Sequence, residues 1–157
     1  AQLCSLDSKT VEKYVILLEQ SYVIFRLNSF SRNLRNELKT SKKIYFYDNG
    51  IRNALIANFN QIEGRADRGA LWENFLISER KKFLEYNRLW GNSWFWRTKE
   101  QKEIDLVEER DGKITGYEFK WNPDQKVKIP RLFLDSYENS DFQVIHRDNC
   151  DSFLLEY

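Results

Sequence analysis

Two carboxylates and a lysine lie on two short apolar segments near the middle of the chain, at residues 103–107 and 117–121. The carboxylates belong to Asp105 and Glu118, and the lysine is Lys120. In proteins Mg²⁺ prefers oxygen ligands, often one or two carboxylates together with water and the phosphate oxygens of a substrate. The two acids could therefore hold a divalent cation, provided that the fold brings them together.

An Asp-Gly pair at residues 111–112 separates the two segments, and such a pair between strand-like segments is the strongest short-range signal for a β-hairpin. If these are the two loop residues, Asp105 lies directly opposite Glu118, and Glu103 lies opposite Lys120. Side chains alternate along a strand, so Asp105, Glu118 and Lys120 would share one face of the hairpin. The other face would be apolar and would contact the core through Ile104, Leu106, Tyr117 and Phe119.

If the two acids lie directly opposite each other, their repulsion destabilises the hairpin unless another group relieves it. Directly opposed residues have Cβ atoms about 4.5–5.5 Å apart, and like charges there are destabilising. Either a proton, which raises the pKa of one carboxylate, or a divalent cation would relieve the repulsion. Two alternatives remain open: a solvated face on which Glu103 and Glu118 pair with Lys120, and a register shifted by one residue.

Length and composition restrict the class of protein. A chain of 157 residues with 41% hydrophobic and 15% aromatic residues fits one ordered domain, or one domain with a fragment of another. Cys4 and Cys150 are its only cysteines, so neither a disulfide framework nor a zinc site is expected, and a reducing cytoplasm is the expected compartment. No signal peptide or membrane-spanning apolar run occurs. The sequence contains no Met, and we therefore expect a piece of a longer polypeptide.

Charge is distributed unevenly along the chain, although the formal net charge is only +1. Residues 1–62 hold nine Lys or Arg and five Asp or Glu, whereas residues 63–157 hold sixteen and nineteen. This distribution fits a polyanion-contacting module joined to a metal-dependent site. The basic stretch at residues 32–43 could be a wing on DNA or a solvated linker. Arg97, Lys99 and Lys102, which precede the segment at residues 103–107, could contact phosphates, but an exposed, solvated loop is an alternative at least as well supported.

The pattern of apolar residues predicts an α/β fold with a soft boundary near residues 64–69. The first part should hold a helix at 5–20, strands at 22–27 and 44–47 and a short helix at 51–59, which is compatible with the second half of a winged helix. The second part should hold a helix at 70–88, a strand at 94–98, the hairpin at 103–121, a helix at 130–138 and closing strands at 142–146 and 153–155. Helices would then pack on a mixed sheet.

An α-β-β-β-α-β order with Glu73 on the first helix, then Asp105, then Glu118 and Lys120, resembles the core of the PD-(D/E)XK nuclease superfamily. Four segments more narrowly resemble the uncharacterised nuclease-like C-terminal domain of prokaryotic AAA-type ATPases: residues 43–51, 69–75, 94–98 and 103–107. The likeness covers nearly the whole chain. Because the phosphate-binding motif GxxxxGK[ST] is missing, the resemblance implies that the ATPase domain lies upstream of this sequence.

The resemblance implies a restriction-endonuclease-like domain at residues 63–157, preceded by a partial winged-helix segment at residues 1–62. It also implies that Asp105 and Glu118 hold Mg²⁺ or Mn²⁺, and that the ion polarises a scissile phosphate and acidifies a bound water. The helix acid Glu73 would contact a second ion or a metal-bound water, unless it is an ordinary helix glutamate. By the same resemblance, Lys120 would orient the water or neutralise charge in the transition state.

The expected function is Mg²⁺-dependent hydrolysis of DNA phosphodiesters, with DNA and the upstream ATPase domain as partners. The alternative is a catalytically inactive nuclease fold that serves the ATPase as a DNA- or protein-binding regulatory module. The presence of Asp105, Glu118 and Lys120 favours hydrolysis, whereas the acidic balance of residues 63–157 offers little surface for a DNA backbone. A third interpretation is a winged-helix DNA binder with an inert appendage.

Overall fold

A computed structural model describes residues 5–32 and 41–155 of the chain. Its first part consists of α1 (Ser8–Gln20), β1 (Ile24–Asn28), β2 (Lys42–Phe46) and α2 (Asn49–Leu55). The Asp7 carboxylate caps α1 by accepting from the Lys9 and Thr10 N–H groups at 2.9 and 3.0 Å, and Asp48 caps α2. Antiparallel pairing joins β1 to β2. Arg35 and Lys39 of the predicted wing lie outside the described residues.

After a short 3₁₀ turn, η2 (Ile62–Gly64), the second part begins with α3 (Arg68–Tyr86). It continues with β3 (Asn92–Arg97), β4 (Glu103–Arg110), β5 (Lys113–Phe119), α4 (Arg131–Ser136), β6 (Ser140–Ile145) and α5 (Cys150–Leu155). The sheet has the order β3-β4-β5-β6, with antiparallel pairs except for the parallel pair β5–β6. The predicted order of helix, three strands, helix and strand, and the predicted mixed sheet, are therefore confirmed.

The predicted closing strand at residues 153–155 is wrong, because this segment is helical and forms the end of α5. A short apolar run is compatible with a strand or a buried helix, and tertiary packing decides between them. Here Phe153 packs its ring against Tyr117 and Phe119 of the sheet. The buried Arg80 side chain donates to the Phe153 carbonyl at 2.6 Å, so that a helix-terminal acceptor is satisfied.

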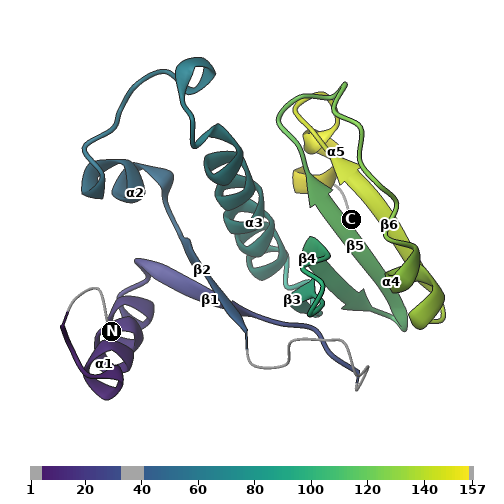
Figure 1. The fold of residues 1–157 in the computed structure, drawn as a ribbon, viewed down its shortest axis with the longest axis horizontal. Helices are drawn as coiled ribbons and strands as arrows, with labels where there is room; N and C mark the ends of the chain where they lie inside the picture. The colour runs from purple at the N-terminus through teal and green to yellow at the C-terminus, as the bar shows by residue number, and fades with distance from the viewer. Residues whose placement is uncertain (1–4, 33–40, 156–157) are drawn as a thin grey trace.

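Two apolar clusters lie on opposite faces of the sheet. In Figure 1, α3 runs between the β1–β2 pair and the four-stranded sheet, and α4 lies near β6. The first cluster combines residues of β1, β2, α3, α5 and the sheet, including Phe25, Tyr45, Leu76, Phe95, Leu106 and Phe119. The second lies against α4 and includes Phe30, Trp96, Ile104, Val107, Ile114 and Phe133. The N-terminal part therefore shares its core with the second part.

Specific hydrogen bonds fix the β1–β2 pair against α3 and β3. The Asn74 side chain of α3 accepts from the Phe46 N–H at 2.8 Å and donates to the Phe46 carbonyl at 2.9 Å. Next to β1, Ser29 forms a parallel bridge with Phe95, and the Phe30 N–H donates to the Phe95 carbonyl at 2.6 Å. These contacts set the position of β2 relative to α3, and this position matters for the site described below.

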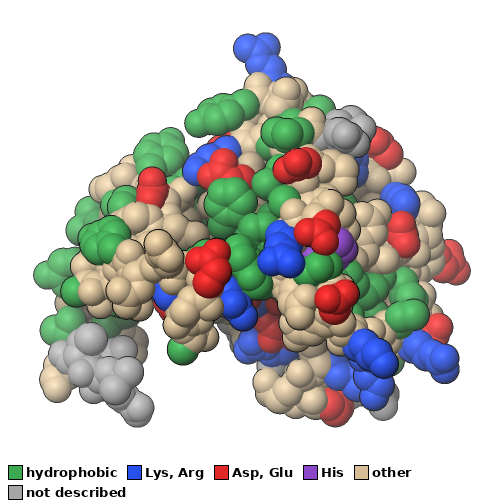
Figure 2. All heavy atoms as spheres, turned by 90° about the horizontal axis from the view of Figure 1, so that it is seen from above, with side chains coloured by type: hydrophobic (Ala, Val, Ile, Leu, Met, Phe, Trp, Pro, Cys, Tyr) green, Lys and Arg blue, Asp and Glu red, His purple; other side chains and the backbone are tan. Residues whose placement is uncertain are grey.

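Large apolar side chains remain exposed on the N-terminal part. Helix α1 buries none of its residues, and green side chains gather over the left side of Figure 2, where α1 and α2 lie. The exposed apolar side chains of this part include Tyr14, Leu17, Leu18, Leu55, Ile56 and Phe59. Among the described residues, no helix is both long enough and apolar enough to cross a membrane.

Candidate active site

The hairpin register was predicted correctly over most of its length. The pairs run from Arg110 with Lys113 at the turn to Leu106 with Tyr117, and Asp111 adopts a positive φ of 49° beside Gly112. The described ladder ends one pair before Asp105 and Glu118, so the two acids are not a regular cross-strand pair.

A β-bulge in β4 changes the direction of the side chains at this point. Trp94 of β3 pairs with Val107 and Trp96 pairs with Ile104, so that β4 contains one extra residue between these pairs. As a result, Ile104 packs in the cluster against α4, whereas Leu106 packs in the cluster against α3. The prediction that both share one core face is therefore wrong, since a bulge breaks the alternation on which it rested.

Asp105 lies at the bulge. There its side-chain carboxylate, and not a backbone carbonyl of β4, accepts a hydrogen bond from the backbone of β5. Its Oδ2 accepts from the Phe119 N–H of β5 at 2.9 Å, and its side chain is 15% exposed. Burial raises the pKa of Asp105 to about 7, aided by repulsion from Glu73 and then Glu118, while the Phe119 N–H and Lys43 oppose the rise. Three of the four predicted site residues are thus close enough to interact electrostatically.

The cation nearest to Asp105 comes from β2 and was missed as a site residue. Lys43 Nζ lies 2.9 Å from Glu73 Oε1 and 3.7 Å from Asp105 Oδ1, and it also contacts Glu103 Oε1. Burial opposes the charge of Lys43, but the three carboxylates together raise its pKa above the ordinary value. The Tyr45 hydroxyl donates to the same Glu73 oxygen at 2.6 Å. The sequence indicated Lys43 only as part of a basic stretch, because its contacts are distant along the chain.

Glu118 and Lys120 form an ion pair of their own, with Lys120 Nζ 2.6 Å from Glu118 Oε1. Both line a groove of about 840 Å³ beside α4, which we call the α4 groove. Glu73 and Lys43 line a shallower cavity of about 320 Å³ beside β2, and Glu103 lines both. Of the two pairs in the predicted solvated-face alternative, only Glu118 with Lys120 is present, because Glu103 pairs with Lys43 and Arg97 instead.

The donor chemistry of this cluster suits a hard divalent cation. Glu73, Glu103 and Asp105 surround the Lys43 ammonium, so these carboxylates already contact a cation that the chain itself supplies. As they stand, no three His, Cys, Asp or Glu side chains within residues 5–32 and 41–155 are arranged to hold a metal ion. A metal would therefore need Lys43 to withdraw and the carboxylates to close around it.

Several other candidate residues have structural contacts. Arg32 of the predicted wing pairs with Glu109, and Arg97 pairs with Glu103, whereas Lys102 is exposed and lines the α4 groove. Most of the tryptophans pack in the core or against the sheet, as predicted; the exception is Trp90, whose side chain is largely exposed.

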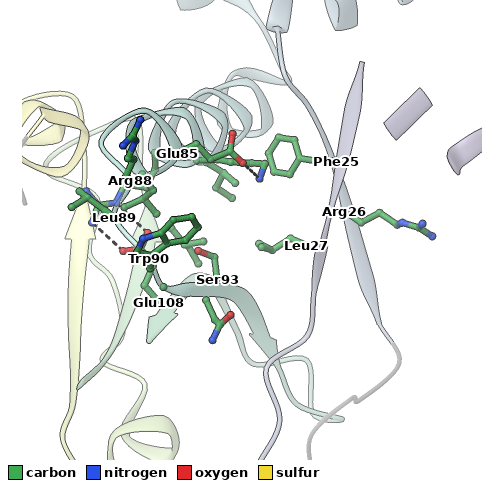
Figure 3. Close-up of a pocket in the computed structure, with 16 residues that line it drawn as sticks. Phe25, Arg26, Leu27, Glu85, Arg88, Leu89, Trp90, Ser93 and Glu108 are labelled. Carbon is green, nitrogen blue, oxygen red and sulfur yellow. Dashed lines mark hydrogen bonds and ion pairs between the residues drawn. The ribbon is translucent and has the colours of Figure 1, made fainter. Parts of the chain in front are cut away.

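A separate cavity of about 430 Å³ lies between β1, α3 and the β3–β4 pair, and Trp90 lines it (Figure 3). The cavity contains a buried bidentate ion pair between Arg80 and Glu108. Arg80 Nε and Nη2 lie 3.1 and 3.0 Å from the Glu108 carboxylate oxygens. None of the predicted site residues lines this cavity. Its Arg80–Glu108 pair joins α3 to β4, which is a structural role.

Comparison with known proteins gives a family but no established activity. Residues 1–62 match a domain of unknown function, DUF8612, and residues 68–150 match another domain of unknown function, DUF4143. Uncharacterised proteins of Mycobacterium bovis and Mycobacterium tuberculosis are each 30% identical over 120 residues, which cover 74% of this chain and 26% of theirs. The match thus spans about a quarter of these relatives. No solved structure matches the chain. The chain belongs to the DUF4143 family.

Proposed function

We propose that this chain is a metal-dependent nuclease-like domain with a restriction-endonuclease-like core, and that it hydrolyses DNA phosphodiesters. The observation that carries this proposal is the convergence of the Glu73, Glu103 and Asp105 carboxylates on the Lys43 ammonium, which leaves Asp105 in an unusual electrostatic state. Burial and the repulsion of Glu73 and Glu118 raise the pKa of Asp105 to about 7, while the Lys43 ammonium lies among the carboxylates. A buried carboxylate with a strongly raised pKa and a specific charged partner is typical of a functional site, and this supports the proposal.

In this proposal, Asp105 and Glu118 hold Mg²⁺ or Mn²⁺, and Glu73 approaches from α3. When bound, the ion supplies Lewis acidity at the scissile phosphate and lowers the pKa of a water molecule. The Phe119 N–H orients one Asp105 oxygen through its 2.9 Å hydrogen bond. Lys120, held by Glu118 at 2.6 Å, supplies positive charge where the phosphate becomes more negative in the transition state.

We propose further that the domain works within a longer polypeptide that contains an AAA-type ATPase domain. The resemblance of the four segments at 43–51, 69–75, 94–98 and 103–107 supports this, and the mycobacterial relatives extend well beyond the matched segment. ATP hydrolysis would then take place outside this sequence.

One observation favours a second candidate function, a non-catalytic nuclease fold that binds DNA or protein. Lys43 supplies an internal cation to Glu73, Glu103 and Asp105, so the repulsion within the acidic cluster is reduced without a metal. A protein that kept the fold only for binding would keep such an internal pair, because an unpaired buried carboxylate is costly.

Cleavage of linear, nicked and branched DNA in the presence of Mn²⁺ tests the two candidates. We expect wild-type protein to cleave, and Asp105→Asn and Lys120→Ala to lose at least about a hundredfold in rate, the usual scale for removing one electrostatic stabiliser. Matched controls are Glu109→Gln on β4 and Lys113→Ala on β5, which lie at the hairpin end remote from the acidic cluster. No cleavage by wild type of any of these substrates would favour the binding module, and metal-dependent cleavage that survives Asp105→Asn would contradict the assignment of the site to Asp105.

A further inference from the structure

The α4 groove carries an excess of cationic side chains next to the acidic cluster. Its charged lining consists of two acids and five cations: Glu103, Glu118, Lys102, Lys120, Lys126, Lys128 and Arg131. The cations come from the turn before β4, the end of β5, and the loop and helix start that follow β5. One wall of the groove therefore contains the predicted catalytic pair Glu118 and Lys120, and the basic loop extends away from it.

The acids of the groove are already neutralised, whereas most of its cations are not. Glu103 contacts Lys43 and Arg97, and Glu118 pairs with Lys120. Among residues 5–32 and 41–155, no ion pair involves four other groove residues, all exposed: Lys102, Lys126, Lys128 and Arg131. Unpaired cations around one concave surface create a positive potential that attracts a polyanion.

The cavity in Figure 3 provides a contrast within the same molecule. It is also lined by several cations, but Arg26 pairs with Glu19, Arg80 with Glu108 and Lys81 with Glu85. Its positive charge is therefore largely compensated by carboxylates of the chain. The uncompensated charge of the α4 groove distinguishes it as a place for an external anion.

The apolar part of the groove indicates which kind of polyanion it fits. Val127 and Ile129 alternate with the loop lysines, and Ile129 is 63% exposed; Leu132 and Phe142 add further apolar lining. A duplex presents mainly phosphates and sugars on its outer surface, whereas a single strand also exposes the faces of its bases. Proteins that bind single strands combine a basic groove with aromatic side chains on which bases stack, and here Phe142 supplies such a ring among the aliphatic residues.

We propose that the α4 groove binds a single-stranded segment of nucleic acid, with phosphates on Lys102, Lys126, Lys128 and Arg131 and bases against the apolar residues of the loop. This inference rests on the proposed function, because a strand along the groove would bring a phosphate to Glu118 and Lys120 at its end. The substrate class of the site is then a nucleic acid with an unpaired segment.

Fluorescence anisotropy with a labelled single-stranded oligonucleotide, in EDTA so that no metal or cleavage takes part, tests the inference. If all four unpaired cations contact phosphates, the slope of log affinity against log salt should be about −2.8, at about −0.7 per contact. The double variant Lys126→Gln/Lys128→Gln should reduce that slope by about 1.4 and weaken binding roughly tenfold at low salt. The matched control is Lys9→Gln/Lys13→Gln, which removes the same charge from two exposed lysines of α1.

The proposal is contradicted if Lys126→Gln/Lys128→Gln binds the strand like wild type, or if the α1 control loses as much affinity. A duplex of the same sequence that binds as tightly would overturn the single-strand assignment, and equally effective displacement by polyglutamate would point to an acidic protein instead. Thermal unfolding establishes that each variant is folded. Wild-type protein that binds the strand but does not cleave it with Mn²⁺ refutes only the proposed function, whereas metal-dependent cleavage that persists without these lysines refutes only this inference.

Discussion

Asp105 has a raised pKa because it lies at a β-bulge, in a buried position and next to two other acids. The bulge directs the side chain between β4 and β5, where Oδ2 accepts from the Phe119 N–H. Burial, Glu73 and Glu118 then disfavour the charged form. In the unfolded chain an aspartate titrates near pH 3.9. The folded protein therefore binds this proton more tightly than the unfolded protein does.

This difference predicts the pH dependence of stability in the absence of metal. Between about pH 4 and pH 7 the folded state holds more protons at Asp105, so the free energy of unfolding should fall as pH rises, by at most about 1.4 kcal/mol per pH unit. Asp67 and Asp141 have lowered pKa values, and they act in the opposite direction and mainly below pH 4. Urea unfolding at a series of pH values measures the effect. Asp105→Asn should flatten the decline, and an unchanged profile in this variant would refute the assignment.

At the scale of elements, the site is formed where β2 meets α3 and the sheet. Asn74 holds β2 through both backbone groups of Phe46, and this contact places Lys43 among Glu73, Glu103 and Asp105. The Asp-Gly turn made the hairpin and its register predictable, because turn chemistry is local. The bulge and the arrival of Lys43 were not predictable, since they depend on pairing with β3 and on packing of residues that are distant in sequence.

The position of Lys43 predicts opposite effects of its removal with and without metal. Lys43→Met leaves three carboxylates without their shared cation, which should destabilise the metal-free protein by roughly 2–4 kcal/mol, somewhat less than for fully buried pairs. Mn²⁺ should then restore stability and raise the melting temperature more than it does in wild type. Thermal shift measurements provide the test, with the exposed neighbour Lys42→Met as control. A variant that loses stability and gains none from Mn²⁺ would exclude competition between Lys43 and a metal.

At the scale of the whole molecule, the two parts of the chain share one apolar core. The order of elements after residue 70 follows from apolar periodicity and turn residues, and it was predicted apart from α5. The sequence could not predict that the second part needs the first for its stability. The apolar residues that connect them lie on strands whose pattern does not indicate what they pack against. Phe25, Leu27 and Tyr45 pack against Trp72 and Leu76 of α3.

This shared core predicts that residues 63–157 are not stable by themselves. Without β1 and β2, the apolar surface of α3 that contacts Phe25 and Tyr45 would be exposed to water. A protein containing only residues 63–157 should melt less cooperatively than the full chain and bind the dye ANS. Differential scanning calorimetry and ANS fluorescence measure this. A truncated protein with a sharp transition at the same temperature would contradict the shared core.

We propose that Glu73, Asp105 and Glu118 hold a divalent cation once Lys43 withdraws from the acidic cluster. Isothermal titration calorimetry of the full chain with Mn²⁺ at neutral pH tests it most directly. The proposal predicts saturable binding that Asp105→Asn abolishes and Glu109→Gln, on the same strand, preserves. Absence of binding to the wild-type chain, or equal binding by wild type and Asp105→Asn, would contradict it.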